Sequence, residues 1–353
     1  MSKIVLTGGG TGGHILPNLS LKPYLKNSFK DIIYIGSNGG LEEEIIARED
    51  DITFERINAF KLDRSKIFSN LLLPFKLLNS VLEAKRILKT YKPEVIFSKG
   101  GFVSVPVCIA GKLLKIPVVS HESDLSMGLA NKIIYKFCNT FCTTFDRTAK
   151  GLKKAVCTGS PIRPSILNGN KNKGYTLTGV NMLRPTLLVM GGSTGALSLN
   201  EALYSALPTL LKKFNVVHIV GKNKGDKTKL YPNYCQIEYC YNIEDIFAIS
   251  DVVISRAGSN AIYELLALKK PMILVPLPKD ASRGDQIENA KYFEDLGYSK
   301  TLLQEDITTD KLILEVNNLF NEKDKYISNM NNAKNVANGA ENIYKEILKV
   351  LKK

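Results

Sequence analysis

Residues 4–14 of the chain read IVLTGGGTGGH, and residues 187–196 read LLVMGGSTGA. Each stretch is a short apolar run that leads into a glycine-rich turn and then into a helix-like stretch. Such a turn lets backbone N–H groups approach an anion closely, and the start of the following helix adds partial positive charge. Because one copy opens each half of the chain, we predict two α/β domains that each carry a phosphate-binding turn.

Strand-like and helix-like runs alternate along the whole sequence. Continuously apolar runs such as 95–97 and 252–254 are typical of parallel strands covered on both faces. The alternation predicts a doubly wound parallel sheet in each half. The predicted strands are 3–7, 31–36, 52–57, 94–98, 117–120, 140–144, 155–158, 186–190, 215–220, 235–239, 251–255 and 271–275.

Two segments depart from this alternation. Residues 160–184 are rich in proline, glycine and asparagine, which predicts an interdomain linker. Residues 323–353 are helix-like, and we predict a helix that Gly339 bends.

The composition is that of a globular protein with reduced cysteines. A length of 353 residues predicts about two domains, and 44% hydrophobic and 23% charged residues are ordinary values for soluble proteins. The six cysteines form no CxxC pair and no zinc spacing, so we expect core thiols rather than disulfides or a metal site. A strand starts almost at the first residue, and no uncharged apolar run reaches the roughly 18 residues of a membrane span. We therefore expect neither a signal peptide nor a transmembrane helix.

The formal charge of +14 arises from 48 basic and 34 acidic residues. Phosphorylated substrates, an anionic membrane surface or nucleic acid are partners that such a charge attracts, and general solubility is the alternative. No nucleic-acid-binding module is recognisable, so we predict no nucleic-acid partner.

Residues 62–90 combine apolar and basic side chains at helical spacing. Leu71, Phe75, Leu78 and Leu82 follow one another at i, i+4, i+7 and i+11, which places them on one stripe of a helix. The stripe belongs either to the core or to a surface that contacts a membrane through apolar groups with a basic rim. The residues predicted for a membrane surface are Arg64, Lys66, Phe68, Leu72, Phe75 and Lys76.

In the first half, chemistry-bearing residues follow the strands. Ligands of open α/β sheets lie beyond the carboxyl ends of the strands, where His14 and Glu122 are expected. A histidine at a helix start has its cationic form disfavoured, so His14 is predicted to be neutral and able to accept a proton. The alternatives are a capping or packed histidine at 14 and a strand-end carboxylate without a role at 122.

The second half holds a denser polar cluster. Arg256 follows a predicted strand, and Glu264 lies on the helix after it, where a carboxylate can hold the vicinal hydroxyls of a ribose; a helix-dipole charge is the alternative. Asp285, Gln286 and Asn289 share one face at a helix start, which suits the hydroxyls of a sugar. A simple N-cap by Asp285 is the alternative there.

Seven motifs in order carry a family resemblance. They are GGGTGGH at 8–14, HES at 121–123, GLANK at 128–132, GSPIR at 159–163, GGSTGA at 191–196, SRAGSNAIYE at 255–264 and GDQIENA at 284–290. Together they resemble the peptidoglycan N-acetylglucosaminyltransferases of glycosyltransferase family 28, over essentially the whole chain. The resemblance implies a GT-B fold with two Rossmann-like domains facing a cleft. The implied divisions are an acceptor- and membrane-associating domain at 1–160, a linker at 161–184, a UDP-GlcNAc-binding domain at 185–335 and a helix at 336–353 that returns to the first domain.

The implied reaction transfers GlcNAc from UDP-GlcNAc to the C4 hydroxyl of MurNAc in undecaprenyl-pyrophosphoryl-MurNAc-pentapeptide (lipid I), which gives lipid II with inversion. The implied partners are therefore UDP-GlcNAc, lipid I, the anionic inner membrane surface and proteins of cell-wall synthesis or division. The implied location is peripheral, on the cytoplasmic face of the bacterial cell membrane. Neither a cofactor nor a metal ion is expected.

The resemblance also implies roles for individual residues. His14 is the candidate base, Ser193 and its turn are expected to contact the donor diphosphate, and Glu264 the ribose. Asp285, Gln286 and Asn289 are expected to read the GlcNAc, and the backbone of Ile243 to contact uracil. The remaining predicted donor-binding residues are Thr11, Gly12, Gly13, Asn131, Arg163 and Arg256.

Three other functions fit parts of this pattern. A diacylglycerol glycosyltransferase would share the fold and the second domain, a UDP-GlcNAc 2-epimerase would share the architecture, and a nucleotide-sugar sensor would bind without turnover.

Overall fold

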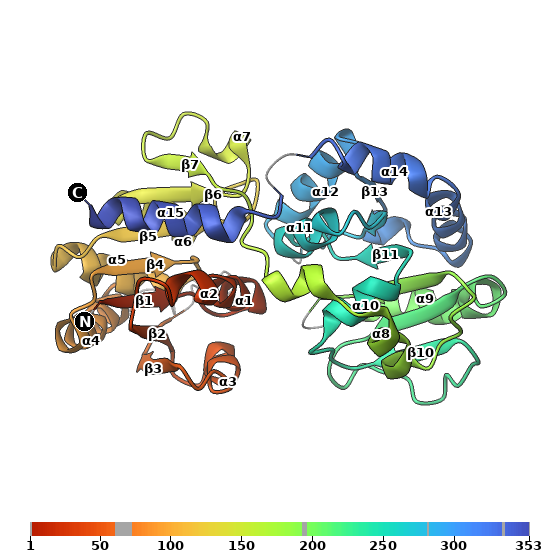
Figure 1. The fold of residues 1–353 in the computed structure, drawn as a ribbon, viewed down its shortest axis with the longest axis horizontal. Helices are drawn as coiled ribbons and strands as arrows, with labels where there is room; N and C mark the ends of the chain where they lie inside the picture. The colour runs from red at the N-terminus through yellow and green to blue at the C-terminus, as the bar shows by residue number, and fades with distance from the viewer. Residues whose placement is uncertain (1, 61–72, 193–195, 281, 334–335, 353) are drawn as a thin grey trace. The chain divides into compact units, whose positions relative to one another are not determined.

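The computed structural model describes residues 2–60, 73–192, 196–280, 282–333 and 336–352. The chain divides into two compact units (Figure 1). Unit 1 comprises Met1–Arg163 together with Ala337–Lys353, and unit 2 comprises Pro164–Val336. Each unit is an α/β structure built on one parallel sheet, so the predicted pair of doubly wound domains is confirmed.

Unit 1 contains a seven-stranded sheet in the order β3-β2-β1-β4-β5-β6-β7, with every neighbouring pair parallel. Its strands are β1 (Lys3–Thr7), β2 (Asp31–Ser37), β3 (Ile52–Ile57), β4 (Val95–Ser98), β5 (Val118–Glu122), β6 (Thr140–Thr143) and β7 (Ala155–Cys157). The strand order reverses between β1 and β4, which is the position where open α/β sheets bind ligands. Thr7 pairs with Ser98 and Ser98 with Ser120, so β1, β4 and β5 reach this edge in register.

Helices cover both faces of this sheet, which explains why its strands are apolar along their whole length. Ile4 and Leu6 of β1 belong to one core, and Val5 between them belongs to the other. The helices are α1 (Gly12–Ser20), α2 (Lys22–Leu25), α3 (Leu41–Ile46), α4 (Leu73–Tyr91), α5 (Ser104–Leu113), α6 (Leu129–Phe137), α7 (Asp146–Ala149) and α15 (Gly339–Leu351).

The last helix, α15, comes from the C-terminus and packs in unit 1, beside β5 and β6 in Figure 1. Its buried Ile343 and Ile347 join the core that contains Ile4 and Leu6. The prediction of one helix bent at Gly339 is wrong, because α14 (Lys323–Met330) ends before Gly339 and α15 begins there. A Cβ at position 339 would lie 2.0 Å from the Ser160 carbonyl oxygen, so glycine is what permits this close approach.

Unit 2 contains a six-stranded parallel sheet in the order β10-β9-β8-β11-β12-β13. Its strands are β8 (Thr186–Met190), β9 (Asn215–Ile219), β10 (Tyr234–Ile237), β11 (Val252–Ser255), β12 (Met272–Leu274) and β13 (Ser299–Thr301). Its helices are η2 (Pro164–Asn168), α8 (Lys171–Thr178), α9 (Leu197–Leu210), α10 (Ile243–Ile249), α11 (Ser259–Ala267), α12 (Asp285–Asp295), η3 (Gln304–Asp306), α13 (Thr309–Asn321) and α14.

All the strands predicted from the sequence are present, with ends shifted by at most two residues. Strand β13 was not predicted, because its three residues, Ser299, Lys300 and Thr301, form no apolar run.

The segment 160–184, predicted to be an interdomain linker, contains the boundary between the two units at residues 163 and 164 and is largely helical beyond it. Residues 164–168 and 171–178 form η2 and α8, and α8 packs against α10 within unit 2. The Asn170 side chain accepts a hydrogen bond from the Lys173 N–H and so caps α8, while the Asn170 N–H donates to Asp245 Oδ1 at 2.7 Å. A Cβ on Gly174 would lie 2.3 Å from the Asp245 carbonyl oxygen. The polar and small residues therefore serve a cap and a close helix contact.

In the part of the chain that the structure describes, we find no helix with the length and apolar character needed to cross a bilayer.

Candidate active site

The first glycine-rich turn lies between the end of β1 and the start of α1. Gly10 adopts a φ of +87°, which favours glycine. A Cβ on Gly8 would lie 2.6 Å from the His14 carbonyl oxygen, so the turn folds back closely on the helix that follows it. Thr11 and Gly13 are exposed and Gly12 is buried at the start of α1.

A carboxylate that the sequence did not reveal lies beneath this turn. Glu42, near the start of α3, is fully buried. Its Oε1 accepts hydrogen bonds from the Ser37 N–H at 2.7 Å and the Ser37 hydroxyl at 2.5 Å, and its Oε2 accepts from the Gly10 N–H at 3.2 Å. The Gly10 N–H of the turn is thus already bonded to the buried Glu42 carboxylate, and this bond fixes the conformation of the turn. In the sequence Glu42 stands in a run of three glutamates at a helix start, so nothing distinguished it.

Glu42→Gln is expected to destabilise the protein by about 1–3 kcal/mol, because an amide cannot accept from all three donors and leaves buried groups unpaired. Chemical denaturation measures this change in the free energy of unfolding. Glu44→Gln is the matched control, since Glu44 is an exposed residue of the same helix. Equal stabilities of the two variants would contradict this role for Glu42.

His14 lies in the first turn of α1 and is half-buried. Its Nδ1 is 3.2 Å from the backbone carbonyl oxygen of Lys99, at the end of β4. Since a carbonyl oxygen only accepts, the contact assigns the hydrogen to Nδ1. The lone pair is then on Nε2, which is the arrangement that a general base requires.

The end of β5 carries two buried ionisable side chains. His121 Nε2 donates to the Gly159 carbonyl oxygen at 3.0 Å, and burial, helped by the charge of Lys99, lowers the pKa of His121 well below its ordinary value. Glu122 accepts from the Asp124 and Gly128 N–H groups at 3.0 Å each and from Asn131 Nδ2 at 2.9 Å. These contacts favour a structural role for Glu122 in shaping the segment that follows β5.

Asn131, on α6, is buried against the same edge. Its Nδ2 also donates to the His121 carbonyl oxygen at 3.2 Å. A Cβ on Gly100 would lie 2.7 Å from Asn131 Oδ1, so Asn131 packs directly on the loop that follows β4. The structure therefore brings Asn131 to the same strand edge as His14, while Arg163 is the last residue of unit 1 before unit 2 begins.

Lys99 is a second residue of this edge that no sequence motif singles out. It follows the buried strand β4 and is only 1% exposed. Its Nζ donates to the hydroxyl of Ser123. Burial lowers the pKa of Lys99 to about 8, although the charges of Glu122 and Asp124 act in the opposite direction. The sequence does contain a signal for Lys99. A lysine between an apolar strand and two glycines is expected at the end of that strand, at the edge where α/β sheets bind ligands.

In unit 2 the second glycine-rich turn follows β8. Gly192 has a φ of +81°, whereas Ser193 lies outside the described residues.

Arg256 follows β11, and its guanidinium donates hydrogen bonds to groups of unit 2, the unit to which Arg256 belongs. It donates to the carbonyl oxygens of Val275 and Pro276 at 3.2 and 3.3 Å and to Gln304 Oε1 at 2.7 Å. Burial lowers its pKa. Arg256 thus joins the ends of β11 and β12 to η3, and it holds the loop after β12 in place.

The remaining candidates lie on α11 and α12, with Ile243 apart from them at the start of α10. Glu264 is half-buried in the second turn of α11, beyond the first turn in which a helix dipole stabilises an acid. Asn289 is buried, and its Nδ2 donates to the Ala257 carbonyl oxygen at 3.3 Å. Gln286 Oε1 accepts from the Leu277 N–H at 3.1 Å. These two bonds fix α12 against the loops after β11 and β12.

Asp285 is the first residue of α12 and lies 3.5 Å from the Arg283 guanidinium. The N-cap residue of α12 is Gly284, so Asp285 is not the simple N-cap. Among the residues that the structure describes, no three His, Cys, Asp or Glu side chains gather in a way that would hold a metal ion.

The predicted membrane residues Arg64, Lys66, Phe68 and Leu72 lie outside the described residues. The continuation of the stripe on α4 is exposed, with exposed fractions of 68% for Phe75, 56% for Leu78 and 48% for Leu82. We call these three side chains the α4 stripe. The core is instead contacted by the face of α4 that carries Val81, Ala84 and Leu88. The core interpretation is therefore wrong for the α4 stripe.

Basic groups accompany the α4 stripe. The Nζ of Lys76 lies 4.8 Å from the ring centre of Phe60, an exposed aromatic residue after β3. The α4 stripe is therefore an exposed apolar surface on a helix that also carries Lys76.

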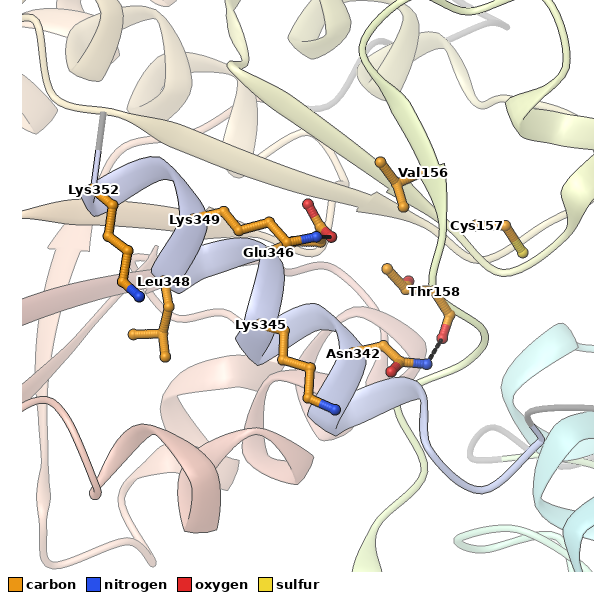
Figure 2. A pocket seen from close by; sticks show the side chains of 9 residues that line it. All are labelled: Val156, Cys157, Thr158, Asn342, Lys345, Glu346, Leu348, Lys349 and Lys352. Carbon is orange, nitrogen blue, oxygen red and sulfur yellow. Dashed lines mark hydrogen bonds and ion pairs between the residues drawn. The ribbon is translucent and has the colours of Figure 1, made fainter.

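A cavity of about 470 Å³ lies elsewhere in unit 1, between the end of β7 and α15 (Figure 2). It is lined by Val156, Cys157, Thr158, Asn342, Lys345, Glu346, Leu348, Lys349 and Lys352. Lys345 pairs with Glu341 at 2.7 Å and Lys349 with Glu346 at 2.5 Å, so two of its three lysines are already in ion pairs. No predicted site residue is in its lining.

Comparisons with known proteins identify the family of this chain. The Glycosyltransferase family 28 N-terminal domain matches residues 4–143, and the Glycosyltransferase family 28 C-terminal domain matches residues 186–347. The chain is 48% identical over 356 residues to the UDP-N-acetylglucosamine–N-acetylmuramyl-(pentapeptide) pyrophosphoryl-undecaprenol N-acetylglucosamine transferase of Clostridium botulinum strain Langeland, covering 100% of both chains. It is 50% identical over 335 residues to the protein of that name from Lachnospira eligens, covering 94% of each.

Among solved structures, the crystal structure of Acinetobacter baumannii MurG superposes with a TM-score of 0.77 at 24% identity, covering 99% of this chain and 100% of that one. This likeness shows the GT-B fold, and the relatives and the two domain matches show the family. The chain belongs to glycosyltransferase family 28.

Proposed function

We propose that this chain is an inverting N-acetylglucosaminyltransferase that transfers GlcNAc from UDP-GlcNAc to the C4 hydroxyl of MurNAc in lipid I and so forms lipid II. The observation that carries the proposal is the full-length match to relatives named for this transfer. A diacylglycerol glycosyltransferase and a UDP-GlcNAc 2-epimerase are disfavoured, because those relatives cover the whole chain at 48–50% identity.

His14 is the proposed base for the acceptor. The Lys99 carbonyl oxygen holds its Nδ1–H at 3.2 Å, which leaves Nε2 to take the proton of the C4 hydroxyl. The hydroxyl oxygen forms the new bond to the anomeric carbon as the bond from that carbon to the diphosphate oxygen breaks. The bonding electrons leave with UDP, and attack from the opposite face inverts the α-linkage to β.

Unit 2 is the proposed donor-binding unit. Ser193 and the backbone of the turn after β8 are assigned to the diphosphate, whose growing negative charge N–H groups and the start of α9 would stabilise. Glu264 is assigned to the ribose hydroxyls and the Ile243 backbone to uracil. Asp285, Gln286 and Asn289 are assigned to the GlcNAc. The contacts of Gln286 with Leu277 and of Asn289 with Ala257 fix α12 against the loops that follow β11 and β12.

Arg256 is better assigned to support than to direct donor contact. Its guanidinium already binds two backbone carbonyls and Gln304, so its proposed role is to hold the loop that follows β12. Thr11, Gly12 and Gly13 remain proposed ligand contacts through the first glycine turn, and Asn131 and Arg163 remain proposed contacts near the sugar.

The proposed location is the cytoplasmic face of the cell membrane, where the protein is peripheral. The polyprenyl tail of the proposed acceptor stays in the bilayer, so the enzyme must reach the lipid surface. The exposed α4 stripe and the charge of +14 support such binding. Proteins of cell-wall synthesis and division are proposed partners at that surface.

One assay separates the candidate functions. Labelled UDP-GlcNAc is incubated with a lipid I analogue, and the product is identified by mass spectrometry and glycosidase digestion. A β-1,4-linked disaccharide on the lipid supports the proposal. A free 2-epimer, a glycosylated diacylglycerol when that lipid is supplied, or donor binding without any product would each replace it.

The double variant Phe75→Glu with Leu78→Glu is expected to weaken binding to anionic vesicles by at least about tenfold. Two apolar side chains that would each contribute about 1.5–3 kcal/mol on burial are replaced by anions. Turnover on full-length lipid I should fall, whereas turnover on a short-chain soluble analogue should not. Sedimentation with vesicles and parallel assays of the two acceptors measure these effects.

Leu314→Glu is the matched control, since Leu314 in unit 2 is 57% exposed and Leu78 is 56% exposed. The proposed role of the α4 stripe in membrane binding is contradicted if the two variants bind vesicles equally. It is also contradicted if the double variant loses activity with both acceptors.

A further inference from the structure

We infer that Lys99 is a positioning residue for the proposed transfer, because it ties the loop that orients His14 to the segment that follows β5. The inference rests on the proposed function and names a residue that neither the sequence motifs nor the family comparisons single out.

Lys99 connects the ends of three neighbouring strands. Its N–H donates to the Thr7 carbonyl oxygen of β1 at 2.9 Å, and its own carbonyl oxygen receives His14 Nδ1–H at 3.2 Å. Its Nζ donates to the Ser123 hydroxyl, one residue beyond β5. A Cβ on Gly8 would lie 3.2 Å from Lys99 Cβ, so the glycine turn also packs on this residue. Any displacement of Lys99 therefore moves the acceptor that holds the His14 ring.

The surroundings of the Lys99 ammonium are poorly suited to a purely structural lysine. Glu122 and Asp124 favour its charge from the β5 side, but the Glu122 oxygens are bound to the Asp124 N–H, the Gly128 N–H and Asn131. Further titratable side chains near this edge include His121 on β5, His14 on α1 and Glu42 under the first glycine turn. The bond that Nζ makes to Ser123 is thus to a neutral hydroxyl, and burial of the charge is incompletely compensated.

This burial has a defined consequence for stability. Burial lowers the pKa of Lys99 to about 8 from its ordinary value of 10.5. Between these two pH values the unfolded chain binds more protons than the folded one, so stability rises with pH across that window. Below pH 8 the cost of burying the ammonium is present in full. A buried charge that costs stability is typical of a functional site.

The test compares Lys99→Met, Lys99→Arg and the wild type by kcat, KM and thermal unfolding between pH 6.5 and 9.5. For Lys99→Met we expect kcat to fall about 10–100-fold, KM for UDP-GlcNAc to stay within about twofold, and the unfolding temperature at pH 7 to be unchanged or higher. In the wild type, kcat should decline above about pH 8 as the ammonium is lost. Lys99→Arg keeps its charge there, so it should retain most of kcat and lose this alkaline decline.

Lys270→Met is the matched control. Lys270 in unit 2 is also a lysine whose pKa is lowered by burial, and its Nζ donates to the Ser250 carbonyl oxygen at 2.8 Å. This variant should leave kcat and its pH profile unchanged.

The inference is overturned if Lys99→Met retains the wild-type kcat and alkaline decline. It is also overturned if the loss of kcat in Lys99→Met merely follows a loss of unfolding temperature, and if Lys99→Arg restores neither kcat nor the unfolding temperature. A wild-type protein that makes no lipid-linked product contradicts the proposed function itself. If the wild type makes the lipid-linked product and the Lys99 variants have its kcat and its pH profile, this inference alone is contradicted.

Discussion

Replacing His14 with alanine is expected to lower kcat by about 10²–10⁴-fold, the usual contribution of general acid–base catalysis, while the Kd for UDP-GlcNAc changes little. The reason is that the His14 Nδ1–H contact with Lys99 places the lone pair of the neutral ring on Nε2, the proposed basic atom. Steady-state kinetics with a lipid I analogue and calorimetry with the donor measure the two quantities separately.

Added imidazole provides a control for this variant. It should restore part of the turnover if the alanine variant lacks only a base, and the unfolding temperature should stay near that of the wild type. Near-normal turnover in His14→Ala would remove His14 from the mechanism. A large loss of donor affinity would instead make it a ligand contact.

The second large effect is expected at Glu264. Glu264→Ala should weaken UDP binding by about 1.5–3 kcal/mol, equivalent to roughly 10–150-fold in Kd, because hydroxyls that bound a charged acceptor lose it. The position of Glu264 in the second turn of α11 supports a ligand contact over a helix-dipole effect. Calorimetry with UDP measures the change directly.

A comparison of UDP with 2′-deoxy-UDP sharpens this experiment. The wild type should bind the deoxy ligand more weakly, and Glu264→Ala should bind both ligands equally, since the missing hydroxyl and the missing carboxylate remove the same interaction. Asp310→Ala, at an exposed helix start in the same unit, is the matched control. Unchanged UDP affinity in Glu264→Ala would leave this residue without the proposed role.

The two sheets could be predicted because their signals are local. Strands such as β4 and β11 are continuous apolar runs, and each glycine-rich turn follows directly on one of them. Burial on both faces of a parallel sheet imposes that pattern on the strand itself. Strand β13 carries no such run, because a three-residue edge strand with partly exposed side chains needs little apolar character.

The segment 160–184 shows where composition misleads. Asparagine and glycine are typical of loops, but here Asn170 caps α8 and Gly174 allows α8 to approach α10. Asparagine and glycine occur both in open loops and at caps and close helix contacts. The neighbour that distinguishes the two cases here is α10, and the sequence contains no signal for that contact.

The parallel α/β architecture, the place of both glycine turns and the residues expected at the strand ends all follow from patterns within the sequence. The contacts that these residues make depend on how the chain folds. The His14–Lys99 contact joins residues 85 positions apart, and Arg256 reaches Gln304 48 positions away. The exposure of the α4 stripe, rather than its burial, was likewise decided by which face of α4 meets the sheet. Periodicity identifies a face of a helix, but the partner of that face is supplied by distant parts of the chain, so burial and hydrogen bonding appear only when the chain is folded.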